Sequence, residues 1–259
     1  FEKASTRTRM SFEVGVVELG GYPLFLSGQD LQIGRGEPLT DTIQVMSRYV
    51  DALMIRTYAH ETVETLAQHG SIPIINGLTD FHHPCQVLAD LLTIEEQFGS
   101  RAGKVLAYIG DGNNMAHSLM IGGALSGMHI RIASPNGYTV DQNIYEKAQK
   151  LATSTGGSIE LFENPSLAVN EADIIYTDVF ASMGQEGEAE ERLMKFNGFQ
   201  VNKELMALAN PDAIFLHCLP AHRGEEVTAD VIDGPQSWVF DQAENRLHAQ
   251  KALMLTLLT

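Results

Sequence analysis

The sequence predicts an α/β protein made of two doubly wound parallel-sheet domains. Short runs rich in β-branched and aromatic residues alternate with segments whose apolar residues recur at helical spacing. This alternation is typical of parallel sheets that carry helices on both faces. A chain of 259 residues corresponds to one or two domains, and a polar, glycine-bearing stretch at 97–103 predicts a junction near residue 100.

The expected strands are short buried runs, and the expected helices each have an apolar stripe. The strands are predicted over 22–27, 52–57, 72–78, 104–111, 129–135, 158–163, 173–180, 213–219 and 238–241. The helices are predicted over 6–19, 39–48, 61–69, 86–98, 115–125, 141–153, 203–208 and 246–258. The acidic stretch 183–191, which has two glycines, is expected to be a mobile loop.

Composition and charge narrow the functional classes. Hydrophobic residues make up 44% of the chain and charged residues 19%, as in a folded globular protein. The net charge of −16 disfavours nucleic acid and anionic membrane as partners, so an anionic ligand needs local arginines or backbone N–H groups. Two cysteines without a CxxC pair predict no disulfide framework and favour a reducing, cytoplasmic setting.

Small hydroxyls and two arginines open the first predicted helix, in Ser5-Thr6-Arg7-Thr8-Arg9. Free N–H groups at a helix N-terminus attract an anion such as phosphate, and Arg7 can add a bidentate contact. The alternative is a serine N-cap followed by a basic first turn. Cations at that end oppose the helix dipole, which favours an anion as their partner.

Two further arginines are candidates for the same anion. Arg56 ends the apolar strand 52–57, at the sheet edge where ligands bind in this class of fold. Arg246 lies in the opening turn of the last predicted helix, where a cation again opposes the dipole. A surface ion pair is the alternative for Arg56.

A histidine and a glutamine follow the third predicted strand, in His83-Pro84-Cys85-Gln86. Pro84 suits the first turn of a helix, where His83 and Gln86, three residues apart, can face one ligand. A histidine in this position can polarise a carbonyl oxygen. A metal site with His82 and Cys85 is the alternative, but no third ligand follows at a suitable spacing.

The stretch GDGNN at 110–114 partly resembles a dinucleotide-binding turn. Met115 stands at the position of the third glycine, and no acidic residue follows about 20 positions later. The pattern therefore disfavours a nicotinamide cofactor. Asn113 and Asn114 open a predicted helix and are candidates to offer amide groups to another ligand.

Asp178 and Cys218 lie at the carboxyl ends of two later predicted strands. Asp178 is a candidate to accept a hydrogen bond from an ammonium group, and the loop after it has the composition of a lid. A polar turn is the alternative there. Cys218 is either a nucleophile, with His217 or His222 as its base, or a small apolar residue that shapes a pocket.

Together these motifs resemble the aspartate/ornithine carbamoyltransferase family, and within it the branch that uses ornithine. STRT with HPxQ is typical of transcarbamoylases, and an SMG loop with HCLP is typical of the ornithine branch. The matches follow the family's order: FEKASTRTR at 1–9, HPCQ at 83–86, DGNN at 111–114, DVFASMGQE at 178–186, HCLPAHRGEEV at 217–227 and AENR at 243–246.

The resemblance implies two substrate sites and no cofactor or metal. Its expected catalytic residues are Arg56, His83 and Cys218. The residues expected to bind carbamoyl phosphate are Ser5, Thr6, Arg7, Thr8, Gln32, Arg56, His83, Gln86, Cys218, Leu219 and Arg246. The residues expected to bind L-ornithine are Asn114, Asp178, Ser182 and Met183. Gln32 resembles the residue that the family lends to the neighbouring subunit's site.

The resemblance also implies domain limits and an assembly. A carbamoyl-phosphate-binding domain is expected over 1–99, an ornithine-binding domain over 100–242, and a C-terminal helix over 243–259 that packs back on the first domain. Family members carry a further helix and strand before FEKASTRTR, so the first domain is expected to be N-terminally incomplete. The family's trimers share their sites between subunits, so a cytoplasmic homotrimer is expected.

The implied activity is transfer of the carbamoyl group from carbamoyl phosphate to the δ-amine of L-ornithine. Direct attack through a tetrahedral intermediate would give citrulline and phosphate, with Asp178 and Cys218 orienting the amine. Three alternatives stay open. They are another amine acceptor such as putrescine or N-acetylornithine, a dinucleotide-dependent oxidoreductase, and a non-catalytic ligand-binding fragment.

Overall fold

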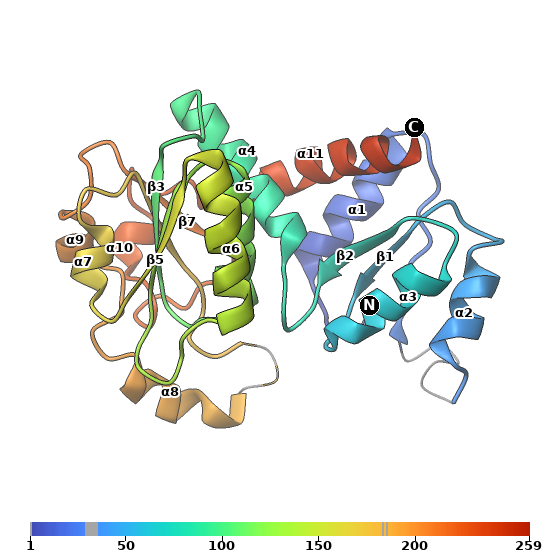
Figure 1. Cartoon of the computed structure of the whole chain (residues 1–259), viewed down its shortest axis with the longest axis horizontal. Helices are drawn as coiled ribbons and strands as arrows, with labels where there is room; N and C mark the ends of the chain where they lie inside the picture. Colours follow the sequence, from blue (N-terminus) through green and yellow to red (C-terminus); the bar gives the residue numbers. More distant parts are fainter. Residues whose placement is uncertain (1, 29–35, 183, 185) are drawn as a thin grey trace. The chain divides into compact units, whose positions relative to one another are not determined.

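A computed structural model of the chain describes residues 2–28, 36–182, 184 and 186–259. The chain divides into two compact units, residues 1–89 with 244–259 and residues 90–243 (Figure 1). Both divisions fall inside helices, in α4 (Pro84–Phe98) and in α11 (Val239–Leu258). Within the described ranges, we find no helix with the length and apolar character needed to span a bilayer.

The first unit contains a two-stranded parallel sheet of β1 (Leu53–Arg56) and β2 (Ile74–Leu78). The register shifts between Ile55 and Arg56, which places Arg56 opposite Leu78 at the carboxyl end of both strands. The helices of this unit, besides parts of α4 and α11, are α1 (Thr6–Glu18), α2 (Leu39–Met46) and α3 (His60–His69).

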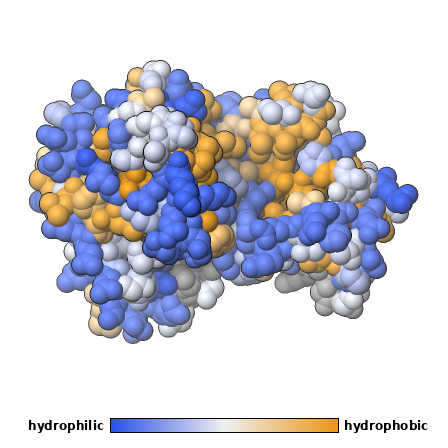
Figure 2. All heavy atoms as spheres, in the orientation of Figure 1, coloured by the Kyte–Doolittle hydropathy of each residue, from blue (hydrophilic) through white to orange (hydrophobic). Residues whose placement is uncertain are grey.

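A small apolar core joins the elements that carry the predicted cations. Phe12 on α1, Ile75 on β2, Cys85 on α4 and Met254 on α11 are all buried against one another. Figure 2 shows hydrophobic residues gathered over α1 and the end of α11, where Val17 and other large apolar side chains are exposed.

The second unit contains a five-stranded parallel sheet with the strand order β5-β4-β3-β6-β7. Its strands are β3 (Val105–Ile109), β4 (His129–Ala133), β5 (Ser158–Phe162), β6 (Ile174–Thr177) and β7 (Ile214–His217). Because β4 and β5 lie on one side of β3 while β6 and β7 lie on the other, the order reverses between β3 and β6. Ligands of doubly wound sheets bind beyond the carboxyl ends of the strands at such a reversal.

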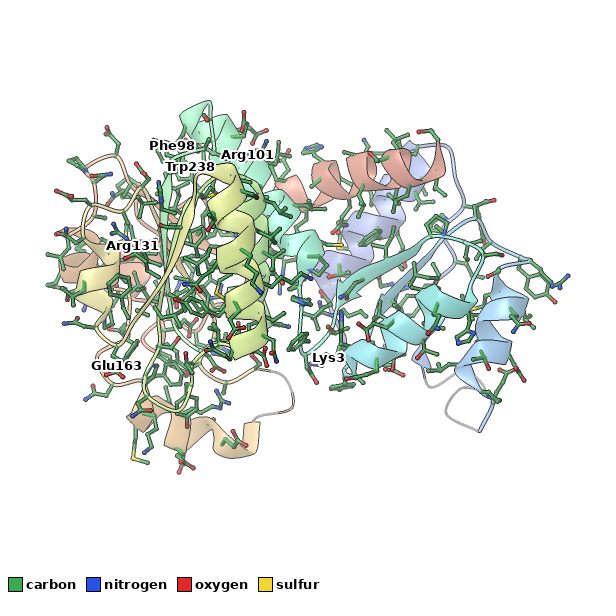
Figure 3. All side chains as sticks on the ribbon, in the orientation of Figure 1. Lys3, Phe98, Arg101, Arg131, Glu163 and Trp238 are labelled. Atoms are coloured by element: carbon green, nitrogen blue, oxygen red, sulfur yellow. The ribbon has the colours of Figure 1, made fainter. Side chains whose placement is uncertain are left out.

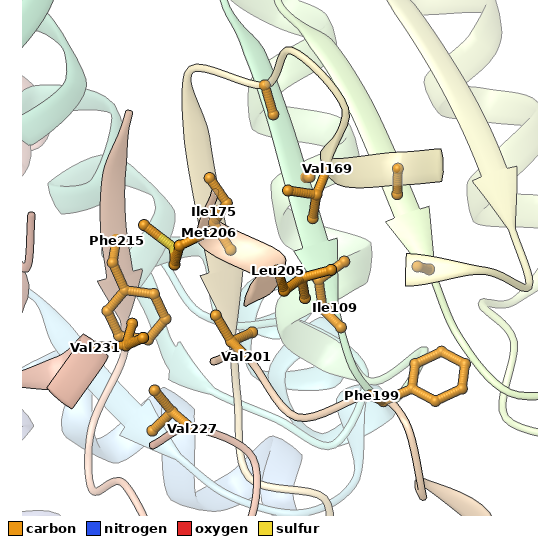
Figure 4. Packing of buried hydrophobic residues seen from close by; sticks show 14 of the residues in the cluster. Ile109, Val169, Ile175, Phe199, Val201, Leu205, Met206, Phe215, Val227 and Val231 are labelled. Atoms are coloured by element: carbon orange, nitrogen blue, oxygen red, sulfur yellow. The ribbon is translucent and has the colours of Figure 1, made fainter. Parts of the chain in front are cut away.

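Helices cover the sheet of the second unit and close its core. They are α5 (Asn114–Leu125), α6 (Gln142–Thr155), α7 (Pro165–Val169), α8 (Ala189–Lys195), α9 (Lys203–Met206) and α10 (Ala229–Ile232), with the 3₁₀ turn η3 (Glu186–Glu188). Figure 4 shows Ile109 of β3, Ile175 of β6 and Phe215 of β7 packed with Leu205 of α9 and Val231 of α10. The outward face of α6 is hydrophilic in Figure 2.

The structure confirms the α/β class and the parallel sheets but corrects three predicted segments. Residues 22–27 form no strand, and Tyr22 and Leu24 are largely exposed, so apolar composition without a partner strand was not enough. Residues 238–241 are also not a strand, because α11 begins at Val239. Only Ser237 makes an isolated bridge to Phe215. The expected loop 183–191 contains η3 and the start of α8.

Candidate functional site

The N-terminus of α1 is built to face an anion. Ser5 is its N-cap, and the Ser5 Oγ atom accepts the Thr8 N–H at 3.2 Å and lies 3.1 Å from Thr8 Oγ1. The first turn contains no acidic residue. Arg7 is half-buried there, and Thr6 is exposed. The positive end of the helix dipole and the arginine therefore both favour a negatively charged ligand.

Arg246 ties three helices of the first unit together. Its guanidinium donates to Thr8 Oγ1 at 3.2 Å, to Gln86 Oε1 at 2.9 Å and to Gln250 Oε1 at 2.9 Å. Gln250 in turn donates to Ser11 Oγ at 2.7 Å. These three acceptors of Arg246 are neutral oxygen atoms. They fix the direction of the guanidinium without adding a negative charge beside it.

His83 immediately precedes α4, and its carbonyl accepts the Gln86 N–H at 3.2 Å. The pKa of His83 is lowered well below its usual range, chiefly by burial and then by the charges of Arg246, Arg56 and Arg7. The imidazole is therefore neutral at pH 7 and carries one N–H donor. Arg56, buried at the end of β1, lies among the cations that act on it.

The loop before His83 is held by a set of contacts that the sequence did not predict. Thr79 Oγ1 accepts the backbone N–H groups of Phe81 at 3.3 Å and His82 at 3.1 Å. Lys3, labelled in Figure 3, is buried, pairs with Asp80 and lies 4.5 Å from the centre of the Tyr58 ring. Lys3, shortly before STRT, therefore helps to fix the loop that presents His83.

We call Thr8, Arg56, His83, Gln86 and Arg246 the anion cluster. Hydrogen bonds join Ser5, Thr8, Gln86 and Arg246, while electrostatics couple Arg7 and Arg56 to His83. The predicted residue Gln32 lies outside the described residues.

The second unit places polar side chains at the carboxyl ends of β3, β6 and β7. Asn113 is the N-cap of α5, where its Oδ1 accepts the N–H groups of Met115 and Ala116, and its Nδ2 donates to Asp178 Oδ2 at 3.0 Å. Asp178 Oδ1 accepts from Cys218 Sγ at 3.1 Å. We call Asn113, Asp178 and Cys218 the strand-end cluster.

The sequence pointed to both asparagines of the DGNN motif, and Asn113 is the one that contacts Asp178. Asn114 is the first residue of α5, and its carbonyl accepts the Ser118 hydroxyl at 2.7 Å. Ser182 is half-buried after β6, and Met183 lies outside the described residues. Leu219 follows Cys218 with a positive φ of 58° and a cis bond to Pro220.

A buried tyrosine and an ion pair flank the strand-end cluster. The Tyr108 hydroxyl donates to Asn113 Oδ1 at 3.3 Å, and burial, followed by Asp178, raises the Tyr108 pKa well above its usual range. Arg192 on α8 donates to Asp111 Oδ2 at 2.8 Å and to the Phe180 carbonyl at 3.0 Å. One guanidinium thus links the loop after β3 to the loop after β6.

Both ring nitrogens of His217 make hydrogen bonds. Nδ1 accepts the Leu219 N–H at 2.8 Å, so the proton of the neutral ring is on Nε2, which faces Glu226 Oε1 at 3.2 Å. Ligand-type atoms of Asp178, His217 and Cys218 lie within 4.8 Å of one another, as do those of His222, Glu225 and Glu226. In the first group, both nitrogens of His217 are already engaged by protein atoms.

The GDGNN turn at 110–114, which partly resembled a dinucleotide motif, packs tightly against residues 138–140. The Gly112 N–H donates to the Tyr138 carbonyl at 2.8 Å. A Cβ atom on Gly112 would lie 2.3 Å from the Thr139 carbonyl carbon and 2.4 Å from the Val140 nitrogen. Glycine is therefore needed here for close packing of the chain against itself, which is a different use from cradling a pyrophosphate.

The sequence motifs assigned no functional role to several buried polar residues that support the two clusters. They are Tyr108, Asp111, Arg192, Glu226, Gln242 and Gln250. Gln250 could have been recognised as a candidate, because it is an amide side chain inside an apolar helical stretch. No spacing rule connected Arg192 to Asp111, which lie 81 positions apart.

Comparison with known proteins places each unit in the same family. Residues 1–96 match the family model described as the carbamoyl-P binding domain of aspartate/ornithine carbamoyltransferase. Residues 102–257 match the Asp/Orn binding domain of the same family.

Individual relatives match over almost the whole chain. The ornithine carbamoyltransferase of Halalkalibacterium halodurans is 60% identical over 100% of this chain and 81% of its own length. The ornithine carbamoyltransferase of Thermococcus kodakarensis is 60% identical over 98% of this chain and 81% of its own.

Solved structures give the same picture. The ornithine carbamoyltransferase of Pyrococcus furiosus aligns with a TM-score of 0.95 and 58% identity, over 99% of this chain and 82% of its own. An anabolic ornithine carbamoyltransferase of Campylobacter jejuni aligns with a TM-score of 0.94 and 44% identity, over 99% of this chain and 85% of its own.

Proposed function

The chain belongs to the aspartate/ornithine carbamoyltransferase family, and from this premise we propose that it transfers the carbamoyl group of carbamoyl phosphate to the δ-amine of L-ornithine. The products are L-citrulline and phosphate. The observation that carries the proposal is the anion cluster, in which the hydrogen-bonded Arg246 and the buried Arg56 act electrostatically on a neutral histidine. This combination suits a ligand with a phosphate at one end and a carbonyl at the other.

The anion cluster and the start of α1 bind carbamoyl phosphate in this proposal. Ser5, Thr6, Arg7 and Thr8 take the phosphate oxygens at the helix N-terminus, and Arg246 adds charge from α11. The neutral His83 donates its N–H to the carbamoyl oxygen, and Arg56 stabilises the negative charge that grows there during attack. Gln86 contacts the same carbamoyl group, and Gln32 is proposed to complete the site of a neighbouring subunit.

The strand-end cluster orients the acceptor amine. An alkylammonium has a pKa near ~10.4, so the δ-nitrogen must lose a proton before its lone pair attacks. Asp178 and Cys218 position that nitrogen, and Asn114, Ser182, Met183 and Leu219 are proposed to contact the rest of the substrates. The first proton leaves the δ-ammonium to solvent before attack. The new N–C bond then forms, the C–O bond to phosphate breaks, and the departing phosphate takes up the second proton, which the nitrogen loses as the ureido group forms.

Four acceptors offered in parallel test this function. We expect the purified protein with carbamoyl phosphate to make a ureido product from L-ornithine and none from putrescine, N-acetylornithine or aspartate. A product with putrescine or N-acetylornithine alone would assign a different acceptor. Binding of both substrates without any product would favour a non-catalytic role.

We further propose a homotrimer whose sites are shared between subunits. The exposed apolar side chains of α1, Met10, Val14 and Val17, support self-association, because such residues recur on one helix face. Light scattering on the purified protein should give the mass of a trimer or of a multiple of trimers. A monomer with full activity contradicts this assembly.

We also propose a cytoplasmic location. Cys85 and Cys218 are both free thiols, as is usual in a reducing compartment. Cell fractionation with the activity as a marker tests this, and activity recovered outside the cytoplasm contradicts it.

A further inference from the structure

Gln242, in the first turn of α11, is a fully buried amide with three partners. Its Oε1 accepts the backbone N–H of His217 at 3.0 Å. Its Nε2 donates to Asp90 Oδ1 at 2.6 Å and to the Tyr176 hydroxyl oxygen at 3.1 Å. All four residues belong to the second unit and are buried, so one carboxamide connects α4, α11, β6 and β7.

The amide completes an otherwise unfinished sheet edge. Because β7 is the outer strand, its outward N–H groups have no neighbouring strand to bond. The Phe215 N–H donates to the Gln236 carbonyl at 2.7 Å, and the N–H of Trp238, labelled in Figure 3, donates to the Phe215 carbonyl at 3.0 Å. The next outward N–H belongs to His217, the last residue of β7. It donates to the side chain of Gln242 instead of to a backbone carbonyl.

The position of Cys218 depends on this edge. Cys218 is the residue after His217, and on its other side the Leu219 N–H is bound to the His217 ring. The backbone on both sides of the thiol is therefore anchored through His217. Tyr176 belongs to β6, and its hydroxyl oxygen accepts a hydrogen bond from Gln242. It lies two residues before Asp178, whose carboxylate accepts the hydrogen bond of the Cys218 thiol.

We infer that Gln242 is a positioning residue for the acceptor half of the reaction: its carboxamide, oriented by Asp90, holds the two strand ends that carry Cys218 and Asp178. The kinetic part of this inference rests on the proposed function. An amide suits the position because one side-chain group both accepts from the His217 N–H and donates to the Asp90 carboxylate. Leucine offers neither, and glutamate offers the donor only while it holds a proton.

The first test compares two glutamine variants of similar size. Gln242→Leu should lower kcat about tenfold and raise KM for ornithine about tenfold, with KM for carbamoyl phosphate changed less than about twofold. Gln236→Leu is the matched control, because Gln236 Nε2 donates to the Ala213 carbonyl at 2.8 Å, before the start of the same strand. Unchanged kinetics in Gln242→Leu, or an equal rise in both KM values, overturns the inference.

The second test reverses the polarity of the pair. In Gln242→Glu, a neutral carboxyl group keeps the acceptor for the His217 N–H and one donor for Asp90, but its ionised form sets two carboxylates face to face among Asp90, Tyr176 and His217. Acceptor turnover should therefore fall with rising pH more steeply than in the natural protein. Asp90→Asn combined with Gln242→Glu supplies an N–H donor to the new carboxylate and should restore the natural pH profile. A natural profile in the single variant contradicts the inference.

The third test needs no substrate. Alkylation of Cys218 by iodoacetamide, followed by mass spectrometry, should change at least about threefold in Gln242→Leu and remain unchanged in Gln236→Leu. Cys85 is an internal reference, because burial raises its pKa to about 11. If the natural protein makes no citrulline while this rate responds, the proposed function fails and the positioning role stands. An unresponsive rate in a folded Gln242→Leu protein overturns the positioning role.

Discussion

The anion cluster of the first unit gathers arginines around a buried neutral histidine, whereas the strand-end cluster of the second unit combines a carboxylate with a thiol. Both stand at the carboxyl ends of parallel strands. The difference comes from the surrounding helices. In the first unit the opening turn of α1 contributes Thr8 and α11 contributes Arg246, while in the second unit the polar groups follow the strands themselves. One architecture thus supports two sites of opposite charge.

The two clusters also keep their charges available in the same way. Arg246 is oriented by neutral oxygens of Thr8, Gln86 and Gln250, and Asp178 is oriented by an amide and a thiol. Neutral partners fix direction at little electrostatic cost to the ligand. Arg192 differs, because Asp111 and Glu188 pair with it and its role is to join loops.

The largest predicted effect comes from a substitution in the anion cluster. Arg56→Ala should lower kcat/KM for carbamoyl phosphate by about 10²–10³-fold, because a buried cation aimed at the developing oxyanion is worth roughly 3–4 kcal/mol. Steady-state kinetics with a circular-dichroism check of folding measure this. Arg48→Ala, at an exposed arginine of the same unit, should behave as the natural protein. Near-normal turnover of Arg56→Ala would remove Arg56 from the mechanism.

The next effect breaks the second cluster and leaves the first intact. Asp178→Asn should raise KM for ornithine by about 30–100-fold, because a charge-assisted hydrogen bond contributes roughly 2–3 kcal/mol. Its control is Asp173→Asn at the opposite end of β6, where Asp173 accepts the Val105 N–H at 2.9 Å. That control should lose stability and keep its ornithine KM. Equal effects of the two variants on KM would contradict the assignment.

The third prediction concerns how the stability of the anion cluster's histidine site depends on pH. Since the folded-state pKa of His83 is depressed by burial and three arginines, the unfolded chain binds a proton that the native state does not. Stability should therefore fall as pH drops below the unfolded pKa of about 6.5, by up to ~1.4 kcal/mol per pH unit from this residue. Urea unfolding between pH 7.5 and 5 should show a smaller loss in His83→Gln. Identical slopes would mean that the pKa of His83 is the same in the folded and unfolded chain, which contradicts its depression by burial and the three arginines.

The smallest effect concerns the thiol. Cys218→Ser should raise KM for ornithine by roughly threefold to tenfold and leave kcat measurable, because a hydroxyl also donates to Asp178. Complete loss of turnover with ornithine still bound would indicate a covalent role for the sulfur instead. Rapid-quench analysis with labelled carbamoyl phosphate separates the two outcomes.

The elements that positioned these groups were predictable from the sequence to different degrees. Strands such as 104–111 and 129–135 were recognised because a buried strand in a parallel sheet is a continuous apolar run. The segment 22–27 has the same composition but no partner strand, and pairing is a tertiary property that a local pattern does not contain. The predicted strand 238–241 was wrong for a similar reason, since its apolar residues Val239 and Phe240 begin the helix α11.

The candidate site was predictable where a local motif carries the chemistry. Ser5 directly precedes a predicted helix, His83 lies between a predicted strand and a predicted helix, and Asp178 lies at the carboxyl end of a predicted strand, where topology favours ligands. Gln242 and Arg192 act through partners that are 152 and 81 residues away in the sequence. Only the folded arrangement brings these pairs together, so no spacing rule could have found them.

Binding of carbamoyl phosphate alone, measured calorimetrically at low temperature, tests the separation of the two clusters most directly. We predict that Asp178→Asn binds carbamoyl phosphate with the natural protein's Kd and that Arg7→Ala, which removes a proposed phosphate contact, binds it at least about tenfold more weakly. Loss of carbamoyl phosphate binding in a folded Asp178→Asn protein, or natural binding in Arg7→Ala, would contradict the assignment of the phosphate donor to the first unit.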